Sequence, residues 1–167
     1  MTQQLQQPIA AGPSVSPPVS LTVGIVGLGC VGLPTAIGFA SSARVVGVDV
    51  DASRRDAIHS LRVDLPEADI ARLHDAIDHK LITITDDAEL LASVDAIVIC
   101  VPTPVDGHLT PDLRPLQAAC DRVVRVARPG QLIVLTSTSY VGTTDDLLVG
   151  PLIARGFQMG KDICVAF

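Results

Sequence analysis

Short apolar runs alternate with longer amphipathic segments along most of this chain. The apolar runs have the length of buried strands and are rich in Val, Ile and Leu, and they lie at residues 23–26, 45–48, 81–84, 94–101, 131–135 and 162–167. The segments between them place apolar residues at helical spacing, over residues 31–42, 52–61, 67–78, 87–92, 111–127 and from 145 onward. This alternation predicts an α/β fold of the Rossmann type: a doubly wound, six-stranded, mainly parallel sheet with helices on both faces.

The ends of the chain and its prolines refine this picture. Residues 1–20 are rich in Gln, Pro and Ser without periodicity, so we expect a disordered leader before a single domain over residues 21–167. Pro151 is expected to bend or end the last helix. Pro102 and Pro104 cannot continue a central strand, so the chain must leave the sheet there, at its carboxyl edge.

Composition narrows the class of protein. Hydrophobic residues make up 48% of the chain and aromatic residues only 2%, so Val, Ile, Leu and Ala must build the core, as suits a parallel sheet buried on both faces. The net charge of −6 argues against nucleic acid or an anionic membrane as the main partner. We expect a cytoplasmic protein because no apolar run is long enough to span a membrane and the first residues lack a signal-peptide pattern.

The cysteines and histidines indicate no metal site. Cys30, Cys100, Cys120 and Cys164 form no C-x-x-C pair, and we expect them to be reduced, buried thiols. The histidines show no metal-ligand spacing either, so no metal is predicted.

The most informative stretch is a glycine turn between the first strand and the first helix. Gly27, Gly29 and Gly32 match G-x-G-x-x-G directly after an apolar strand. The first glycine permits a sharp turn, the second lets the backbone approach a diphosphate, and the third allows the helix to pack on the strand. Cys30 and Val31 lie between these glycines, where amides at the start of a helix face the phosphates. The alternative is a tight connection that uses glycine only for packing.

An acidic residue ends the second predicted strand. Asp49 has the position of a carboxylate that accepts hydrogen bonds from the adenosine ribose, and a 2′-phosphate there would meet a like charge. The sequence therefore predicts NAD, rather than NADP, as the cofactor. Arg54 follows near the start of the next helix, where it either reaches the adenosine ribose or remains solvated.

Hydroxyl residues follow two later strands at the same predicted edge of the sheet. Thr103 lies between the two prolines and is either a cofactor contact or an ordinary loop hydroxyl. Residues 136–144, TSTSYVGTT, form a hydroxyl-rich turn after the fifth predicted strand.

The order of these motifs resembles one enzyme family over about residues 21–167. IVGLGCVGLPTAIGFA with VVGVDVD, then ICVPTPVD, LTPDL and STSYVGTT, are similar to the amino-terminal domain of the UDP-glucose/GDP-mannose dehydrogenases. The proline–aspartate–leucine run and GKDICVAF look most similar to members that act on UDP-N-acetylhexosamines.

The resemblance implies a reaction. Such enzymes oxidise C6 of a nucleotide-linked sugar from alcohol to acid, using NAD twice in succession through a thioester on a cysteine. Carried over, Gly27, Gly29 and Gly32 would hold the diphosphate, and Thr103 and Thr138 would line the cofactor cleft. Thr138 would also lie near the reacting carbon and help to place a water or the sugar hydroxyl, although a threonine is a poor base without a partner.

The resemblance also implies that the family's catalytic residues lie outside this sequence. The family's catalytic cysteine, lysine, asparagine and glutamate come from regions beyond residue 167, and Cys30 cannot replace the cysteine because it lies on the phosphate turn. A UDP-sugar would therefore be a substrate only if the missing substrate and catalytic domains were supplied, and we expect the chain alone to bind NAD and to be inactive. A non-catalytic NAD-binding module that acts with a separate chain is the alternative, and a hydroxyacid-type dehydrogenase is a third. The oligomeric state is not predicted.

Two departures from the family pattern concern the cofactor site. Cys30 stands where an aromatic residue is often found, and Ser60–Asp64 stands where the loop after the second helix usually has a glycine. Both would change the affinity for the cofactor without removing its site.

Overall fold

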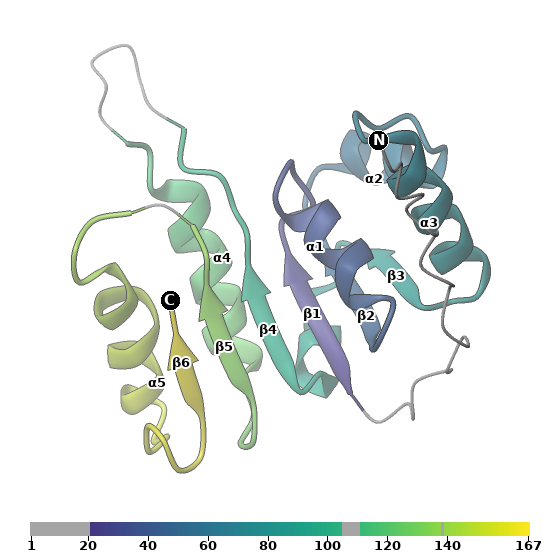
Figure 1. Cartoon of the computed structure of the whole chain (residues 1–167). Helices are drawn as coiled ribbons and strands as arrows, with labels where there is room; N and C mark the ends of the chain where they lie inside the picture. The colour runs from purple at the N-terminus through teal and green to yellow at the C-terminus, as the bar shows by residue number, and fades with distance from the viewer. Residues whose placement is uncertain (1–20, 105–110, 138) are drawn as a thin grey trace, which may run out of the picture.

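A computed structural model describes residues 21–104, 111–137 and 139–167. Six strands form one sheet in the order β3-β2-β1-β4-β5-β6, and all neighbouring strands are parallel (Figure 1). The strands are β1 (Thr22–Val26), β2 (Arg44–Val48), β3 (Ile82–Thr85), β4 (Ala96–Ile99), β5 (Leu132–Leu135) and β6 (Cys164–Ala166). The predicted doubly wound fold is confirmed, with a sheet that is parallel throughout.

The strand order reverses at β1, which lies between β2 and β4. Val26 of β1 is in register with Val48 of β2 and Ile99 of β4, so these three strands end at the same edge. In a doubly wound sheet, the connections diverge to opposite faces at such a point and leave a crevice beyond the strand ends.

Helices cover both faces of the sheet. They are α1 (Gly32–Phe39), α2 (Ala52–His59), α3 (Glu67–Asp78), the 3₁₀ helix η1 (Ala88–Ser93), α4 (Arg114–Val126), the π-helical turn η2 (Asp145–Val149) and α5 (Gly150–Ala154). Figure 1 shows α1, α2 and α3 grouped beside β1, β2 and β3, and α4 behind the sheet at β4 and β5.

Strand β4 shows how the sheet is buried on both sides. Its Ile97 and Ile99 pack with α4, η1, η2 and α5, whereas its Val98, and Cys100 directly after the strand, pack with α1, α2 and α3. Side chains alternate between the two faces of a strand, so the apolar core on each face of the sheet contains every second residue of β4. The predicted core of Val, Ile, Leu and Ala is confirmed.

The helix boundaries differ from expectation at two places. Helix α1 ends at Phe39 rather than near residue 42, and the hydroxyls of Ser41 and Ser42 donate to the Gly38 and Phe39 carbonyls. Pro151 does not end the last helix: it lies in the first turn of α5, directly after the wider turn η2. A proline fits at the beginning of a helical turn because its missing N–H is not needed there.

Helix α2 ends with a left-handed residue that the sequence did not predict. Asp51 caps its start by accepting from the Ser53 amide at 2.8 Å. At its end Leu61 has φ of +56°, and the Arg62 amide donates to the Ala57 carbonyl at 2.8 Å. This is a Schellman ending, in which glycine is the usual residue, so Leu61 occupies a left-handed position that strains its backbone.

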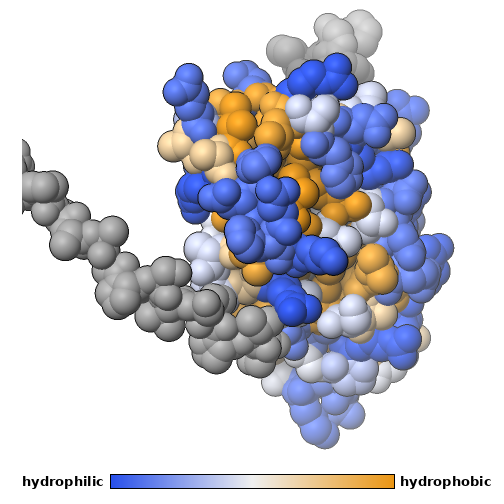
Figure 2. Space-filling model, turned by 90° about the vertical axis from the view of Figure 1, so that its right-hand side faces the viewer, coloured by the Kyte–Doolittle hydropathy of each residue, from blue (hydrophilic) through white to orange (hydrophobic). Residues whose placement is uncertain are grey.

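The cysteines correct one expectation. Cys100 and Cys120 are buried as expected, but Cys30 in the glycine turn and Cys164 on the edge strand β6 are exposed. No helix in the described ranges combines the length and the apolar character that crossing a membrane requires. Figure 2 shows the side of the molecule that carries α2 and α3, where polar side chains cover most of the surface and apolar atoms show between them.

Candidate functional site

The glycine turn connects β1 to α1 at the reversal point of the sheet. Gly27 has φ of +87°, a conformation that side chains rarely adopt. At Gly32 a Cβ atom would stand 1.8 Å from the Gly27 carbonyl oxygen, so the helix can approach the strand this closely only without a side chain there. The turn therefore depends on both glycines for its shape.

The start of α1 presents unused donors. In the described part of the chain, the N–H groups of residues 29–32 have no hydrogen-bond acceptor. Gly29 has open space where its Cβ would be, with no heavy atom within 4 Å. Free amides beside an open backbone at a helix start form a binding place for an anion such as a diphosphate.

Asp49 lies beside this turn at the end of β2. Its Oδ2 accepts from the Leu28 amide at 2.7 Å and its Oδ1 accepts from the Asp51 amide at 3.0 Å. Because each carboxylate oxygen can accept more than one hydrogen bond, the side chain keeps capacity for hydroxyl donors in the adjoining cavity. The carboxylate thus holds the glycine turn and also lines the adjoining cavity.

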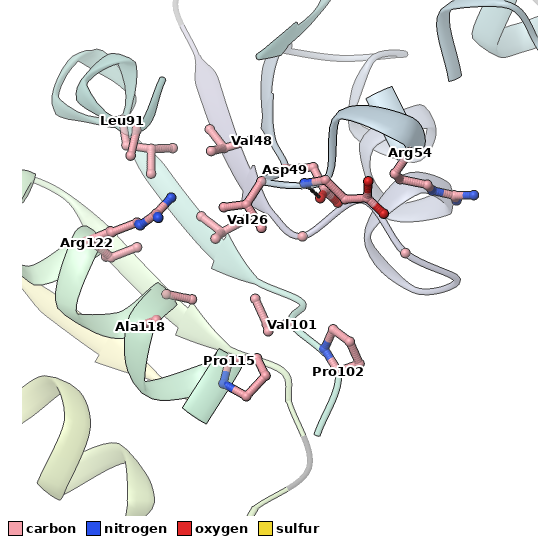
Figure 3. Close-up of a pocket in the computed structure, with 17 residues that line it drawn as sticks. Val26, Val48, Asp49, Arg54, Leu91, Val101, Pro102, Pro115, Ala118 and Arg122 are labelled. Carbon is pink, nitrogen blue, oxygen red and sulfur yellow. Dashed lines mark hydrogen bonds between the residues drawn. The ribbon is translucent and has the colours of Figure 1, made fainter. Parts of the chain in front are cut away.

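Arg54 is fixed rather than freely solvated. Its Nε donates to the Leu28 carbonyl at 2.7 Å, which ties α2 to the glycine turn. Figure 3 shows its guanidinium beyond Asp49, away from the apolar walls. Asp51 lies nearby, and the hydroxyl and amide of Ser53 lower the pKa of its carboxyl group below the usual value.

A cavity of about 480 Å³ opens on one side of the turn, between the strand ends and α4, and we name it the α4 cavity. It is lined by Val26, Gly27, Gly29, Val48, Asp49, Val50, Asp51, Arg54, Ala88, Leu91, Val101, Pro102, Pro115, Ala118, Ala119, Arg122 and Val123. Figure 3 shows apolar side chains on opposite walls, with Asp49 at one end and Arg122 at the other. Such a cavity suits a flat, mainly apolar group with a polar attachment near Asp49.

A smaller crevice of about 190 Å³ lies on the other side of the turn, and we name it the Cys30 crevice. It is lined by Gly29, Cys30, Val31, Cys100, Val101, Pro102, Thr103, Thr136 and Ser137. The two hollows share Gly29, Val101 and Pro102, so one elongated ligand crossing the glycine turn would enter both.

Two hydroxyls that line the Cys30 crevice are already hydrogen-bonded to the protein backbone. The Thr136 hydroxyl donates to the Ile99 carbonyl at 2.9 Å, and the Ser137 hydroxyl donates to the Val101 carbonyl at 2.7 Å. Burial raises the pKa of the Cys100 thiol, which therefore stays protonated near neutral pH. These groups can accept a hydrogen bond from a ligand or contact it sterically, but none is an activated base or nucleophile.

The structure brings most of the predicted site residues together. Asp49 and Arg54 line the α4 cavity, Cys30, Val31 and Thr103 line the Cys30 crevice, and Gly29 borders both. Thr138 lies outside the described residues, as do the leader over 1–20 and the predicted loop over 106–110. No three His, Cys, Asp or Glu side chains in the described ranges are grouped so that they could hold a metal ion.

Sequence reasoning missed the far walls of the α4 cavity. Leu91 of η1 and Ala118 and Arg122 of α4 reach it only because those helices pack together over β1 and β4. The regular spacing of Pro115, Ala118 and Arg122 along α4 was visible, but nothing in it indicated that this face borders a cavity.

Comparison with known proteins agrees with this geometry. The profile of the "UDP-glucose/GDP-mannose dehydrogenase family, NAD binding domain" matches residues 21–166. Protein CapL of Staphylococcus aureus is 37% identical, and UDP-N-acetyl-D-glucosamine 6-dehydrogenase of Pseudomonas aeruginosa is 34% identical. These alignments cover 87% and 88% of this chain but 34% of each relative, so the chain spans about a third of their length.

A solved structure shows the same fold. The UDP-D-ManNAc dehydrogenase of Pyrococcus horikoshii superposes with a TM-score of 0.78 at 35% identity, over 87% of this chain and 35% of that one. The profile match covers the glycine turn, Asp49 and the strand ends that border both hollows. The chain therefore belongs to the UDP-glucose/GDP-mannose dehydrogenase family, as its NAD-binding domain.

Proposed function

We propose that this chain is the cofactor-binding part of an enzyme that oxidises the C6 alcohol of a UDP-N-acetylhexosamine to a uronic acid. The observation that carries the proposal is the pair of hollows that meet at a glycine turn with free amides. In the proposed complex, the adenosine half of NAD lies in the α4 cavity, the diphosphate on the glycine turn, and the nicotinamide half in the Cys30 crevice.

The residues fit this ligand in three ways. Asp49 offers acceptor capacity for ribose hydroxyls, the open space at Gly29 admits a diphosphate, and residues 29–32 supply amide donors. NAD, when bound, supplies the acceptor for a hydride from the alcohol carbon. A 2′-phosphate on the adenosine ribose would meet the Asp49 carboxylate, which supports NAD over NADP.

The chain by itself is proposed to bind NAD without catalysing oxidation. Oxidising an alcohol needs a base within hydrogen-bond reach of the hydroxyl, and a thioester step needs a positioned thiolate. Around the Cys30 crevice, Thr136 and Ser137 donate to backbone carbonyls, and the raised pKa of Cys100 keeps it neutral.

The proposed substrate class is supported by the relatives. The Pseudomonas aeruginosa relative is named a UDP-N-acetyl-D-glucosamine 6-dehydrogenase, and the Pyrococcus horikoshii structure is a UDP-D-ManNAc dehydrogenase. Both names describe UDP-linked N-acetylhexosamines. We therefore propose a UDP-N-acetylhexosamine as the substrate once the remaining two-thirds of the family's length is supplied.

Calorimetric titration of the chain with NAD and NADP tests the cofactor proposal. We expect NAD to bind and NADP to bind at least about tenfold more weakly, the effect of about 1.4 kcal/mol of charge repulsion. NADH absorbance, followed with UDP-N-acetylglucosamine and UDP-N-acetylmannosamine, should not rise with the chain alone. Absence of NAD binding would refute the cofactor site, and NADH formation would refute the inactivity.

A further inference from the structure

Arg122 stands apart from the other charged residues that line the α4 cavity. Asp49 and Asp51 accept from backbone amides, and Arg54 donates to the Leu28 carbonyl. Arg122 makes no hydrogen bond or ion pair with any residue in the described ranges, although it lines the same cavity. Figure 3 shows its side chain extending from α4 toward the space between Leu91 and Val26.

The position of Arg122 along α4 sets it away from the glycine turn. Pro115 lies near Pro102, which borders the turn, as Figure 3 shows. Arg122 is seven residues further along the helix, a rise of about 10 Å. That separation places its guanidinium at the far end of the cavity, beside apolar side chains rather than beside the amides that would hold a diphosphate.

We propose that Arg122 is an adenine-binding residue: its guanidinium packs against the adenine ring of NAD and closes the solvent side of the α4 cavity. This inference rests on the proposed function, which puts the adenosine half of the cofactor in that cavity. The ring would lie between the strand-end valines Val26 and Val48 on one side and α4 on the other.

The physical basis is the match between a planar cation and a flat aromatic ring. A guanidinium stacks on aromatic faces and is less strongly hydrated than an ammonium group. The chain is only 2% aromatic, and none of the described residues that line the cavity is aromatic, so these residues offer an adenine ring no aromatic side chain to stack on. An unpaired guanidinium loses no existing hydrogen bond or ion pair when it turns onto the ligand.

The test compares Arg122→Ala with Arg125→Ala in the full 167-residue chain. Arg125 is an exposed arginine three positions away that lies 3.7 Å from the Glu89 carboxylate and does not line the cavity. Each variant is titrated with NAD, with ADP-ribose, which carries the adenosine half, and with nicotinamide mononucleotide, which lacks it.

We expect Arg122→Ala to weaken NAD and ADP-ribose by about fivefold each, the range of a cation–π contact at a partly exposed site. Nicotinamide mononucleotide should bind as it does to the wild type, and Arg125→Ala should leave all three affinities unchanged. Thermal unfolding should be the same for both variants, because neither side chain is buried.

Three results would overturn the inference while leaving the proposed function standing. These are unchanged NAD and ADP-ribose affinities in Arg122→Ala, equal losses in Arg125→Ala, which would indicate a general charge effect, and an equal loss for nicotinamide mononucleotide. If the wild-type chain binds neither NAD nor ADP-ribose, the proposed function fails, and this inference fails with it.

Discussion

The α4 cavity and the Cys30 crevice meet at one glycine turn but are built differently. The first, about 480 Å³, is enclosed by strand ends, η1 and α4, and it has a carboxylate with spare acceptor capacity. The second, about 190 Å³, is bordered by loops in which the Thr136 and Ser137 hydroxyls already donate to backbone carbonyls. From this difference we expect the domain to hold a dinucleotide mainly by its adenosine half and to leave the reactive half with few fixed contacts.

The largest effect is expected in the glycine turn, where α1 packs against β1 between the two hollows. Gly32→Ala would place a Cβ atom 1.8 Å from the Gly27 carbonyl oxygen, so α1 must move away from β1. We expect a loss of about 3 kcal/mol or more in the free energy of unfolding, as for overpacking in a tight core, measured by urea denaturation. We expect Gly32→Ala to bind NAD much more weakly, because the α4 cavity and the Cys30 crevice would both be distorted.

Gly29→Ala is the matched control within the same motif. Its Cβ atom would meet no heavy atom within 4 Å, so the free energy of unfolding should stay within about 0.5 kcal/mol of the wild type. The methyl group would instead occupy the approach of the diphosphate and weaken NAD binding. Equal stability losses in the two variants would contradict the assigned roles of these glycines.

Asp49→Asn should affect one hollow only. The amide keeps one acceptor oxygen and loses the charge, so NAD and ADP-ribose should bind more weakly by about 1.5–3 kcal/mol, the value of a hydrogen bond to a charged group. Calorimetry should show little change for nicotinamide mononucleotide. Unchanged NAD affinity would remove Asp49 from the site, and an equal effect on both halves would erase the distinction between the hollows.

The smallest effect is a change in thiol reactivity. Thiolates are the reactive form, and burial raises the pKa of Cys100 and raises that of Cys120 to about 12. Iodoacetamide at pH 8 should therefore label the exposed Cys30 and Cys164 first, as mass spectrometry of peptides would show. NAD should slow labelling of Cys30 several-fold and leave Cys164, on the edge strand, unaffected; equal protection of both would argue against NAD in the Cys30 crevice.

Local patterns were enough to predict the fold and the glycine turn at the centre of the candidate site. Helix α3 occupies residues 67–78 as predicted, because its apolar spacing and its flanking residues agree. The glycine turn and Asp49 were predicted because each residue type has a local task there. The walls of the α4 cavity were not predictable, since Leu91 and Arg122 meet only through the packing of η1 and α4.

Other differences have the same origin in tertiary contacts. The sequence did not decide whether Arg54 reaches the adenosine ribose or remains solvated. It could not show that the Arg54 side chain donates a hydrogen bond to the carbonyl of Leu28, 26 residues earlier in the chain. It also gave no sign that Leu61 adopts the left-handed conformation usually taken by glycine. Exposure of Cys164 follows from the place of β6 at the sheet edge, which depends on strand order rather than on local composition.

The bond from Asp49 to the Leu28 amide constrains how this protein could change its coenzyme. A switch to NADP calls for removal of the negative charge, yet the same carboxylate satisfies the amide of a fully buried residue. Replacement by alanine or glycine would leave that donor without its acceptor and would loosen the turn on which either coenzyme depends. An engineered or evolved switch is therefore expected to pass through asparagine or serine, which keep an oxygen there, before any new phosphate-binding arginine is of use.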